Sequence, residues 1–251
     1  MGPSARHLAV VPALNEEATV GEVIARIRAE QPDFDVLVVD DGSLDATAAR
    51  AEAAGARVLR HPYNLGIGGA VQSGFLYARQ EGYDYLVQVD ADGQHDPAEI
   101  EKLLTVMAAD PLMDVICGSR FLRPGNRYPA AISRRTGIHL FSFLLSLLVD
   151  GRVTDPTSGF RLYNRRAIGL FARDYPHDFP EVEAVLMLHH HRLRIVETPV
   201  RMFTRGGGRS SLKGSGKSAY YMVKVLLALL VALARRRPVP EPTERPHPAT
   251  V

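Results

Sequence analysis

The stretch FDVLVVDD, residues 34–41, decides the fold class of this chain of 251 residues. Its centre is continuously apolar and rich in β-branched residues, which is typical of a strand covered on both faces of a parallel sheet. A second strand is expected in HLAVVPAL (7–14). Between the two, VGEVIARIRAE (20–30) carries its apolar residues on one helical face. A strand, a helix and a strand in this order form the unit from which α/β folds are built.

The same alternation continues to residue 120. Further helices are expected at residues 44–55, 69–81 and 97–109, and further strands at 57–60, 83–90 and 114–120. This order predicts a doubly wound, mainly parallel sheet flanked by helices. Ligands of such sheets bind beyond the carboxyl ends of the strands. The polar clusters PALNEE, DDGS and DADGQ all fall at that edge.

Composition narrows the class of protein. The single cysteine, Cys117, excludes a disulfide framework and any zinc site built from several cysteines. Asn15 and Glu16 come too early for a signal peptide, and no apolar run reaches the length of a bilayer span. We therefore expect a cytoplasmic protein. Between Thr198 and Pro240 there are nine Lys or Arg residues and no Asp or Glu, so this segment is the part expected to meet anions.

The stretch QVDADGQHDP (88–97) ends an apolar strand with two carboxylates, Asp90 and Asp92. Alternate residues of a strand share a face, and two anions held so close repel each other unless a cation lies between them. Asp96 is explained as a helix N-cap before Pro97. The other two aspartates have no such explanation, and they predict a site for a divalent metal.

Two further motifs point to a nucleotide ligand. Asp40 and Asp41 end a buried strand. A turn with an N-cap at Ser43 or Asp45 is one explanation. Turn chemistry does not require adjacent aspartates, however, and a carboxylate there can instead bind a ribose or a base edge. The glycines of NLGIGGAVQSG (64–74) allow the backbone to approach a ligand closely. They do not form a dinucleotide fingerprint, because Val71 stands where that motif needs glycine.

Together these motifs resemble one family. The stretches VVPALNEEATV, VLVVDDGSLDAT, NLGIGGAVQSGF, VQVDADGQHDPAEI, GSRF, DPTSGFRLYN and GGGRSSLKG occur in the order and approximate spacing of family 2 glycosyltransferases. The chain most closely resembles the dolichol-phosphate mannose synthase-like, polyprenyl-phosphate glycosyltransferase branch, over about residues 7–230. The resemblance implies a GT-A fold, a nucleotide-diphosphate sugar donor, and Mg²⁺ or Mn²⁺ as cofactor.

The resemblance assigns roles on the donor side. The nucleotide pocket would contain Pro12, Ala13, Asn15, Glu16, Asp41, Gly66, Gly69, Asp90, Ala91 and Asp92. Asp41 would contact the base or the ribose. Asp90, Asp92 and Gln94 would hold the metal, whose preferred ligands are hard oxygens. We expect His95 to pack beside this site or to support a ligand, and we leave it out of the metal site.

On the acceptor side the resemblance implies a group of phosphate-binding residues. They are Arg120, Ser133 with Arg134 or Arg135, Arg161, and Arg205, Arg209 and Lys213 of the basic loop. Asp155 would orient hydroxyls and is counted as catalytic, with Asp90, Asp92 and Arg161. Alternatively, Asp155 is a turn residue that precedes Pro156 and has no role in catalysis.

The resemblance also divides the chain. Residues 1–218 would form the glycosyltransferase domain, with a nucleotide-binding half at about 7–120 and an acceptor half at about 121–218. Residues 219–237 are expected to form a C-terminal apolar helix that ends in three arginines, followed by a proline-rich tail at 238–251 that is expected to be disordered. We expect this helix to lie on the inner face of the cell membrane; packing across a homodimer is the alternative. Nucleic acid is not an expected partner, because no base-stacking aromatics accompany the charge.

These features predict a metal-dependent, inverting glycosyltransferase that moves a sugar from a UDP- or GDP-sugar to a polyprenyl phosphate. A phosphate acceptor is already anionic and needs no general base. The alternatives are a soluble glycosyltransferase acting on a sugar or protein hydroxyl, with Glu183 or Asp155 as base, and a non-catalytic nucleotide-sugar-binding module. A nucleotidyltransferase is a more distant alternative, because its early glycine-rich phosphate loop is missing.

Overall fold

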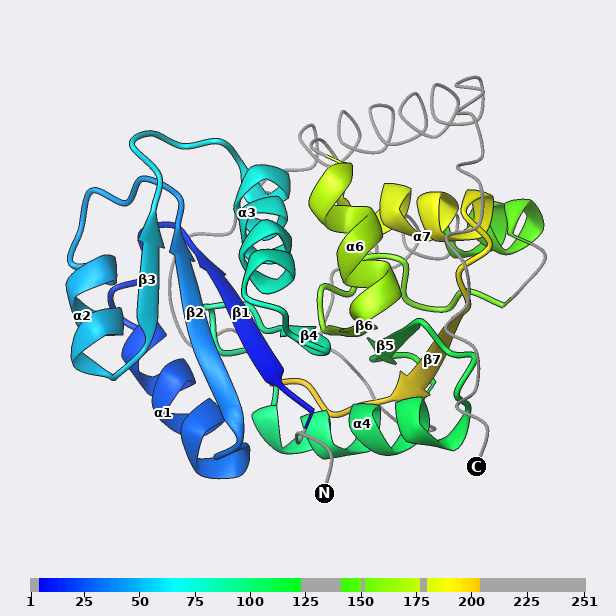
Figure 1. Cartoon of the computed structure of the whole chain (residues 1–251), viewed down its shortest axis with the longest axis horizontal. Coiled ribbons are helices and arrows are strands. Elements are labelled where there is room, and N and C mark those ends of the chain that lie inside the picture. The colour runs from blue at the N-terminus through cyan, green and yellow to red at the C-terminus, as the bar shows by residue number, and fades with distance from the viewer. Residues whose placement is uncertain (1–4, 123–140, 150–151, 177–179, 204–251) are drawn as a thin grey trace.

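The computed structural model describes residues 5–122, 141–149, 152–176 and 180–203, which form a mixed α/β fold around one seven-stranded sheet (Figure 1). The strands are β1 His7–Ala13, β2 Phe34–Asp40, β3 Arg57–Arg60, β4 Tyr85–Gln88, β5 Val115–Ser119, β6 Arg161–Asn164 and β7 Ile195–Pro199. The helices are α1 Val20–Glu30, α2 Thr47–Ala53, α3 Ile67–Gln80, α4 Ile100–Ala109, α6 Arg165–Arg173 and α7 Pro180–His190, with a 3₁₀ turn, η1, at Pro97–Glu99. A further helix lies at residues 141–148.

The strands are ordered β3-β2-β1-β4-β6-β5-β7. β1 pairs in parallel with β2 and β4, β2 with β3, and β5 with β7, whereas β6 runs antiparallel to both β4 and β5. The mainly parallel sheet predicted from the strand and helix alternation is confirmed. The antiparallel strand β6 returns the segment that begins DPTSGF to the centre of the sheet, beside β4.

Each face of the sheet carries its own core, because alternate residues of a strand point to opposite faces. In β1, Leu8 and Val10 belong to the cluster formed with α3 and α6, and Ala9 and Val11 to the cluster formed with α1 and α4. Figure 1 shows these helix pairs on opposite sides of the sheet. Gly74 permits the close approach of α3, since a Cβ atom there would lie 2.5 Å from Val10 Cγ1. The two cores therefore fix β1 and its neighbouring strands, and with them the starting points of the loops at the carboxyl edge of the sheet.

One predicted boundary is wrong in a way that matters. We expected the strand to run from residue 83 to 90, but β4 ends at Gln88. Asp90 and Asp92 therefore lie in the turn that follows the strand, and strand alternation does not determine how their side chains point. Their relative placement is set by turn hydrogen bonds instead.

The expected apolar helix at 219–237 and the tail at 238–251 lie outside the described residues. Within the part of the chain that the structure describes, no helix is long and apolar enough to cross a membrane.

Candidate active site

The loops after β1 and β2 are latched together at the carboxyl edge of the sheet. Asn15 Oδ1 accepts a hydrogen bond from Leu44 N at 2.9 Å, and Asn15 N donates to Ser43 Oγ at 2.9 Å. Glu16 N donates to Thr47 Oγ1 at 2.9 Å. Asn15 has φ +54°, a left-handed conformation that asparagine tolerates better than most residues. Hydrogen bonds thus join the PALNEE and DDGS loops at this edge, and their role as a nucleotide pocket stays a prediction.

Asp41 joins a third loop, residues 61–66, to these two loops through hydrogen bonds. Its buried carboxylate accepts hydrogen bonds from Leu65 N at 2.9 Å and from Gly66 N at 2.8 Å. His61 Nδ1 lies 2.8 Å from the same carboxylate, and His61 Nε2 lies 2.9 Å from Ser73 Oγ on α3. Asp41 was predicted to contact the base or the ribose. Its three contacts here are all within the chain, so the contact with the nucleotide stays a prediction.

The acidic turn, residues 89–94 after β4, is held by hydrogen bonds within the turn and from the end of β4. Gln88 Nε2 donates to Asp90 Oδ1 at 3.2 Å, and Gln94 N donates to Asp92 Oδ1 at 3.0 Å. Gly93 takes a left-handed conformation, with φ +75°, that closes the turn. The Asp90 side chain is 37 % exposed. Both carboxylates are therefore held in place while Asp90 keeps an open side.

Asp96 terminates this turn as predicted. Its side chain accepts a hydrogen bond from Ala98 N at the start of η1, with Pro97 in the first position. It is also paired with Arg26 at 3.0 Å and with Arg201 at 2.9 Å. Asp96 is almost fully buried, and these two arginines compensate its charge. The N-cap reading of Asp96 is confirmed.

The residues of the acidic turn suit Mg²⁺ or Mn²⁺. Asp90, Asp92 and Gln94 supply only oxygen donors within one short turn, which is the donor type that these cations prefer. Among the described residues, no group of three or more His, Cys, Asp or Glu side chains could hold a metal ion. Two carboxylates suffice for Mg²⁺ where substrate phosphates and water complete its coordination. The donor set therefore fits a metal that binds together with a diphosphate.

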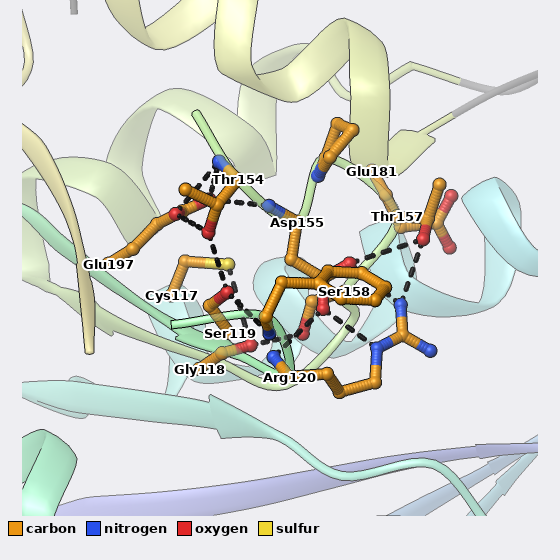
Figure 2. A network of polar contacts seen from close by, with 12 residues as sticks. Cys117, Gly118, Ser119, Arg120, Thr154, Asp155, Thr157, Ser158, Glu181 and Glu197 are labelled. Atoms are coloured by element: carbon orange, nitrogen blue, oxygen red, sulfur yellow. Dashed lines mark hydrogen bonds and ion pairs between the residues drawn. The ribbon is translucent and has the colours of Figure 1, made fainter. Parts of the chain in front are cut away.

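On the acceptor side, two predicted substrate-binding residues bind each other (Figure 2). Arg120 Nε and Nη2 donate to the two oxygens of Asp155, both at 2.7 Å, and Arg120 Nη2 also donates to Thr157 Oγ1 at 2.8 Å. Both residues of the pair are buried. Glu197 on β7 holds the other side of the loop by accepting from the backbone N–H groups of Thr154 and Asp155. A direct role of Asp155 or Arg120 at a substrate stays a prediction.

Arg161, the first residue of β6, is buried, with 1 % of its surface exposed. Its Nη2 donates to the carbonyl oxygens of Glu181 at 2.7 Å and Pro156 at 3.4 Å. Its Nε and Nη1, and the hydroxyl of Tyr163, are buried without a hydrogen-bond partner among the described residues. Burial raises the pKa of Tyr163 and that of the Cys117 thiol, each to about 12. Arg161 thus ties the DPTSGF loop to α7, and its predicted contact with a phosphate stays a prediction.

The remaining predicted residues divide into two groups. Pro12 and Ala13 end β1, Ala91 is buried in the acidic turn, and Gly66 and Gly69 begin α3. Ser133, Arg134, Arg135, Arg205, Arg209 and Lys213 lie outside the described residues. Their phosphate-binding roles stay predictions.

Sequence reasoning missed His61, Ser73, Glu197 and Glu181. The first three act through partners 12 to 43 residues away, and a single sequence carries no local signal for such pairs. Glu181 is half-buried near the start of α7, and this burial raises the pKa of its carboxyl. The sequence instead favours Glu183 on the same helix as a candidate base.

Comparison with known proteins defines the class. Residues 8–170 match the family described as glycosyl transferase family 2. The undecaprenyl-phosphate mannosyltransferase of Micrococcus luteus is 32% identical to the chain over 83% of this chain and 88% of that protein. The polyprenol monophosphomannose synthase of Mycolicibacterium smegmatis is 30% identical over 85% of this chain and 83% of that protein. The protein is a glycosyltransferase, and it belongs to glycosyl transferase family 2.

A solved structure supports the fold. The glucosyl-3-phosphoglycerate synthase of Mycobacterium tuberculosis, crystallised with Mn²⁺, UDP and glucosyl-3-phosphoglycerate, matches with a TM-score of 0.68. The match covers 92% of this chain and 81% of that chain at 23% sequence identity. At this identity the likeness establishes the fold alone. It confirms the predicted GT-A architecture of a mostly parallel sheet flanked by helices.

Proposed function

We propose that the protein transfers a sugar from a UDP- or GDP-sugar to a polyprenyl phosphate, with Mg²⁺ or Mn²⁺ bound at Asp90 and Asp92. The observation that carries this proposal is the position of the acidic turn. The turn follows β4, which pairs with β1. It therefore lies at the same carboxyl edge of the sheet as the hydrogen-bonded loops that carry Asn15 and Asp41. Two relatives over most of the chain are named for polyprenyl phosphate acceptors.

The donor would lie along this edge. The nucleoside would occupy the surface formed by the PALNEE and DDGS loops, and the diphosphate would lie towards Asp90 and Asp92. A bound divalent cation would neutralise the charge that develops on the departing nucleoside diphosphate. Asn15, Ser43 and Asp41 would hold the loops in a fixed shape before the donor binds, which lowers the cost of ordering them.

The acceptor would attack the anomeric carbon in a single displacement that inverts its configuration. A phosphate oxygen is already anionic, so no residue has to remove a proton. Both oxygens of Asp155 already accept two hydrogen bonds each from Arg120 and Thr157, so a hydroxyl acceptor would have to displace one of these donors before Asp155 could take its proton. These contacts favour the phosphate acceptor over the sugar or protein hydroxyl.

The proposal extends to the membrane. A polyprenyl phosphate is held in a lipid bilayer, so the enzyme would work as a peripheral protein at the inner face of the cell membrane. The basic segment after residue 203 and the apolar helix at 219–237 would make that contact.

A binding screen tests the donor half of the proposal. Thermal unfolding would be followed with UDP-glucose, UDP-N-acetylglucosamine and GDP-mannose, each with and without Mn²⁺. A ligand that binds only the folded protein raises the unfolding temperature by mass action. We expect one donor to do so strongly with Mn²⁺ and weakly in EDTA. An unfolding temperature that no donor changes, or a shift that EDTA leaves intact, would contradict the metal-dependent donor site.

A further inference from the structure

His95 is enclosed beside the proposed metal ligands although it is not one of them. Its side chain is 5 % exposed. The imidazole stacks on the ring of Phe160, with centroids 4.9 Å apart and planes at 26°. The backbone of the turn is held by a second segment, because residue 95 forms a β-bridge with Met202 and Gln94 O accepts a hydrogen bond from Phe203 N at 2.8 Å. The ring is therefore held by its stack on Phe160, and the backbone that carries it is held by the segment at residues 202–203.

The hydrogen bond to His95 determines which ring nitrogen carries the proton. Asp90 N lies 3.0 Å from His95 Nδ1. A backbone N–H can only donate, so Nδ1 has to accept and carries no hydrogen. A neutral imidazole with a bare Nδ1 has its proton on Nε2. His95 Nε2 lies 3.6 Å from Asp90 Oδ2, which is too long for a full hydrogen bond but close enough for electrostatic attraction.

Asp90 is thus fixed at three points. His95 Nδ1 holds its backbone, His95 Nε2 faces one carboxylate oxygen, and Gln88 Nε2 donates to the other at 3.2 Å. The exposed remainder of the side chain, 37 %, is the part that can reach a ligand. A carboxylate oriented in this way does not have to give up rotamer freedom when a cation binds.

We propose that His95 is the positioning residue of the metal site, which acts by holding Asp90 ready for Mg²⁺ or Mn²⁺ through the tautomer that is protonated on Nε2. The proposal rests on the proposed function, because it takes Asp90 as a metal ligand. Partners that orient a metal ligand typically contribute 10- to 100-fold in metal affinity. We expect an effect of about that size at His95.

Substitutions at His95 separate the ring from its hydrogen bonds. His95→Phe keeps the stack on Phe160 and loses both nitrogens. His95→Asn places an acceptor near the position of Nδ1 and loses the group at Nε2. The matched control is His7→Phe, because His7 also stacks on aromatic rings, those of Phe34 and Tyr85, at the opposite end of the sheet.

The readout is Mn²⁺ affinity, measured by electron paramagnetic resonance on the full chain with saturating UDP or GDP and no sugar. We expect His95→Phe to weaken Mn²⁺ binding about 10- to 100-fold, His95→Asn to weaken it less, and His7→Phe to leave it unchanged. Equal Mn²⁺ affinity in wild type and a folded His95→Phe protein would overturn the role of His95 alone. A wild type that binds no Mn²⁺ with either nucleotide would overturn the proposed metal site, and this inference with it.

The tautomer is tested on the wild-type protein, so the result does not depend on whether a variant folds. In ¹⁵N NMR spectra of the imidazole groups at pH 8, the His95 signals are identified as those lost in a His95 variant, or by sequential assignment. We expect Nε2 to be protonated and Nδ1 to be bare. A proton on Nδ1 would contradict the proposal, because the Asp90 N–H would then have no acceptor there.

Discussion

Gly159 lies directly against the carboxylate of Asp90, so that the backbone of the DPTSGF loop forms one wall of the acidic turn. A Cβ atom at residue 159 would lie 3.3 Å from Asp90 Oδ1 and 3.4 Å from Oδ2. It would also lie 2.7 Å from Gln88 Nε2. Two motifs that are nearly 70 residues apart in the sequence are thus fitted to each other at the edge of the sheet.

This contact predicts the effect of Gly159→Ala. The added methyl group has to displace the Gln88 amide and then the Asp90 carboxylate, which disturbs the proposed metal ligand. We expect only a small loss in the free energy of unfolding, because the methyl group first meets the end of the flexible Gln88 side chain, together with weaker Mn²⁺-dependent donor binding. Urea unfolding and calorimetry measure the two effects. The control is Gly169→Ala in α6, where a Cβ atom meets nothing within 4 Å. If both variants bind the donor as the wild type does, Asp90 is not held by this contact.

Asp92→Ala tests the acidic turn itself. The variant loses one carboxylate and the hydrogen bond from Gln94 N, so we expect donor binding to lose its dependence on Mn²⁺. The free energy of unfolding should fall by only about 0.5–1.5 kcal/mol, because one hydrogen bond of a partly exposed turn is lost. Asp110→Ala is a matched control, since Asp110 Oδ1 accepts from Leu112 N at 2.9 Å in the same local pattern away from the site. Calorimetry that finds the same Mn²⁺-dependent donor affinity in Asp92→Ala as in the wild type rules out Asp92 as a ligand.

Asp41→Asn has a structural effect that sequence reasoning did not anticipate. An amide can accept at only one of its two ends, so one of the N–H groups of Leu65 and Gly66 would face another donor. Gly66 N also donates to Asn64 Oδ1 at 2.7 Å, and neither Leu65 nor Gly66 is buried, so the cost is that of one hydrogen bond, about 0.5–1.5 kcal/mol. We expect this loss of stability together with weaker binding of UDP and GDP, because the Gly66 loop is released. Asp114→Asn serves as control, since Asp114 is also buried and accepts from Arg194 N and Asn164 Nδ2. It should lower stability without changing nucleotide affinity. Unchanged stability of Asp41→Asn would contradict this account.

The buried Cys117 thiol predicts a fall in stability at high pH. Its pKa is raised by burial from 9.0 to about 12. Between these values the unfolded state loses the thiol proton and the folded state keeps it, so unfolding becomes more favourable as pH rises. Below pH 9 the thiol has no effect on the pH dependence. Its contribution above the unfolded pKa approaches about 1.4 kcal/mol per pH unit.

Urea unfolding at pH 8, 9.5 and 11 measures this effect in the wild type and in Cys117→Ala. Tyr163, also buried and with its pKa raised to about 12, adds a similar loss above pH 10 in both proteins. We therefore expect both proteins to lose stability, and the wild type to lose more. Parallel pH profiles would show that the thiol ionises equally in the folded and unfolded protein.

Much of the fold could be predicted because it is encoded locally. The runs that became β1, β2 and β4 are apolar and short, and the helices between them carry periodic apolar faces, so their order predicted the parallel half of the sheet. The end of β4 was placed too late, because Val89 is apolar and fully buried although it is not part of the strand. The antiparallel strand β6 depends on a chain reversal that apolar periodicity does not reveal.

The site was predictable only in part, because several of its contacts join residues that are far apart in the sequence. Asp90 and Asp92 stand out because no local structure requires them, and a family resemblance supplied their proposed role. The pair of Arg120 and Asp155 joins residues 35 positions apart, and sequence reasoning assigned each of them separately to the substrate. His95 has contacts with Phe160 and Met202 that only the folded chain creates.

The central claim is that this glycosyltransferase moves a sugar from a nucleotide donor to a polyprenyl phosphate with a metal at the acidic turn. The most direct test incubates the purified full chain with radiolabelled GDP-mannose or UDP-glucose and undecaprenyl phosphate in lipid vesicles, with Mn²⁺ or with EDTA. We predict a labelled lipid product of inverted anomeric configuration that forms with Mn²⁺ and is absent in EDTA. It should also be absent from Asp92→Ala. A labelled lipid that forms equally in EDTA, or label that reaches only an added sugar or protein hydroxyl, would contradict the account.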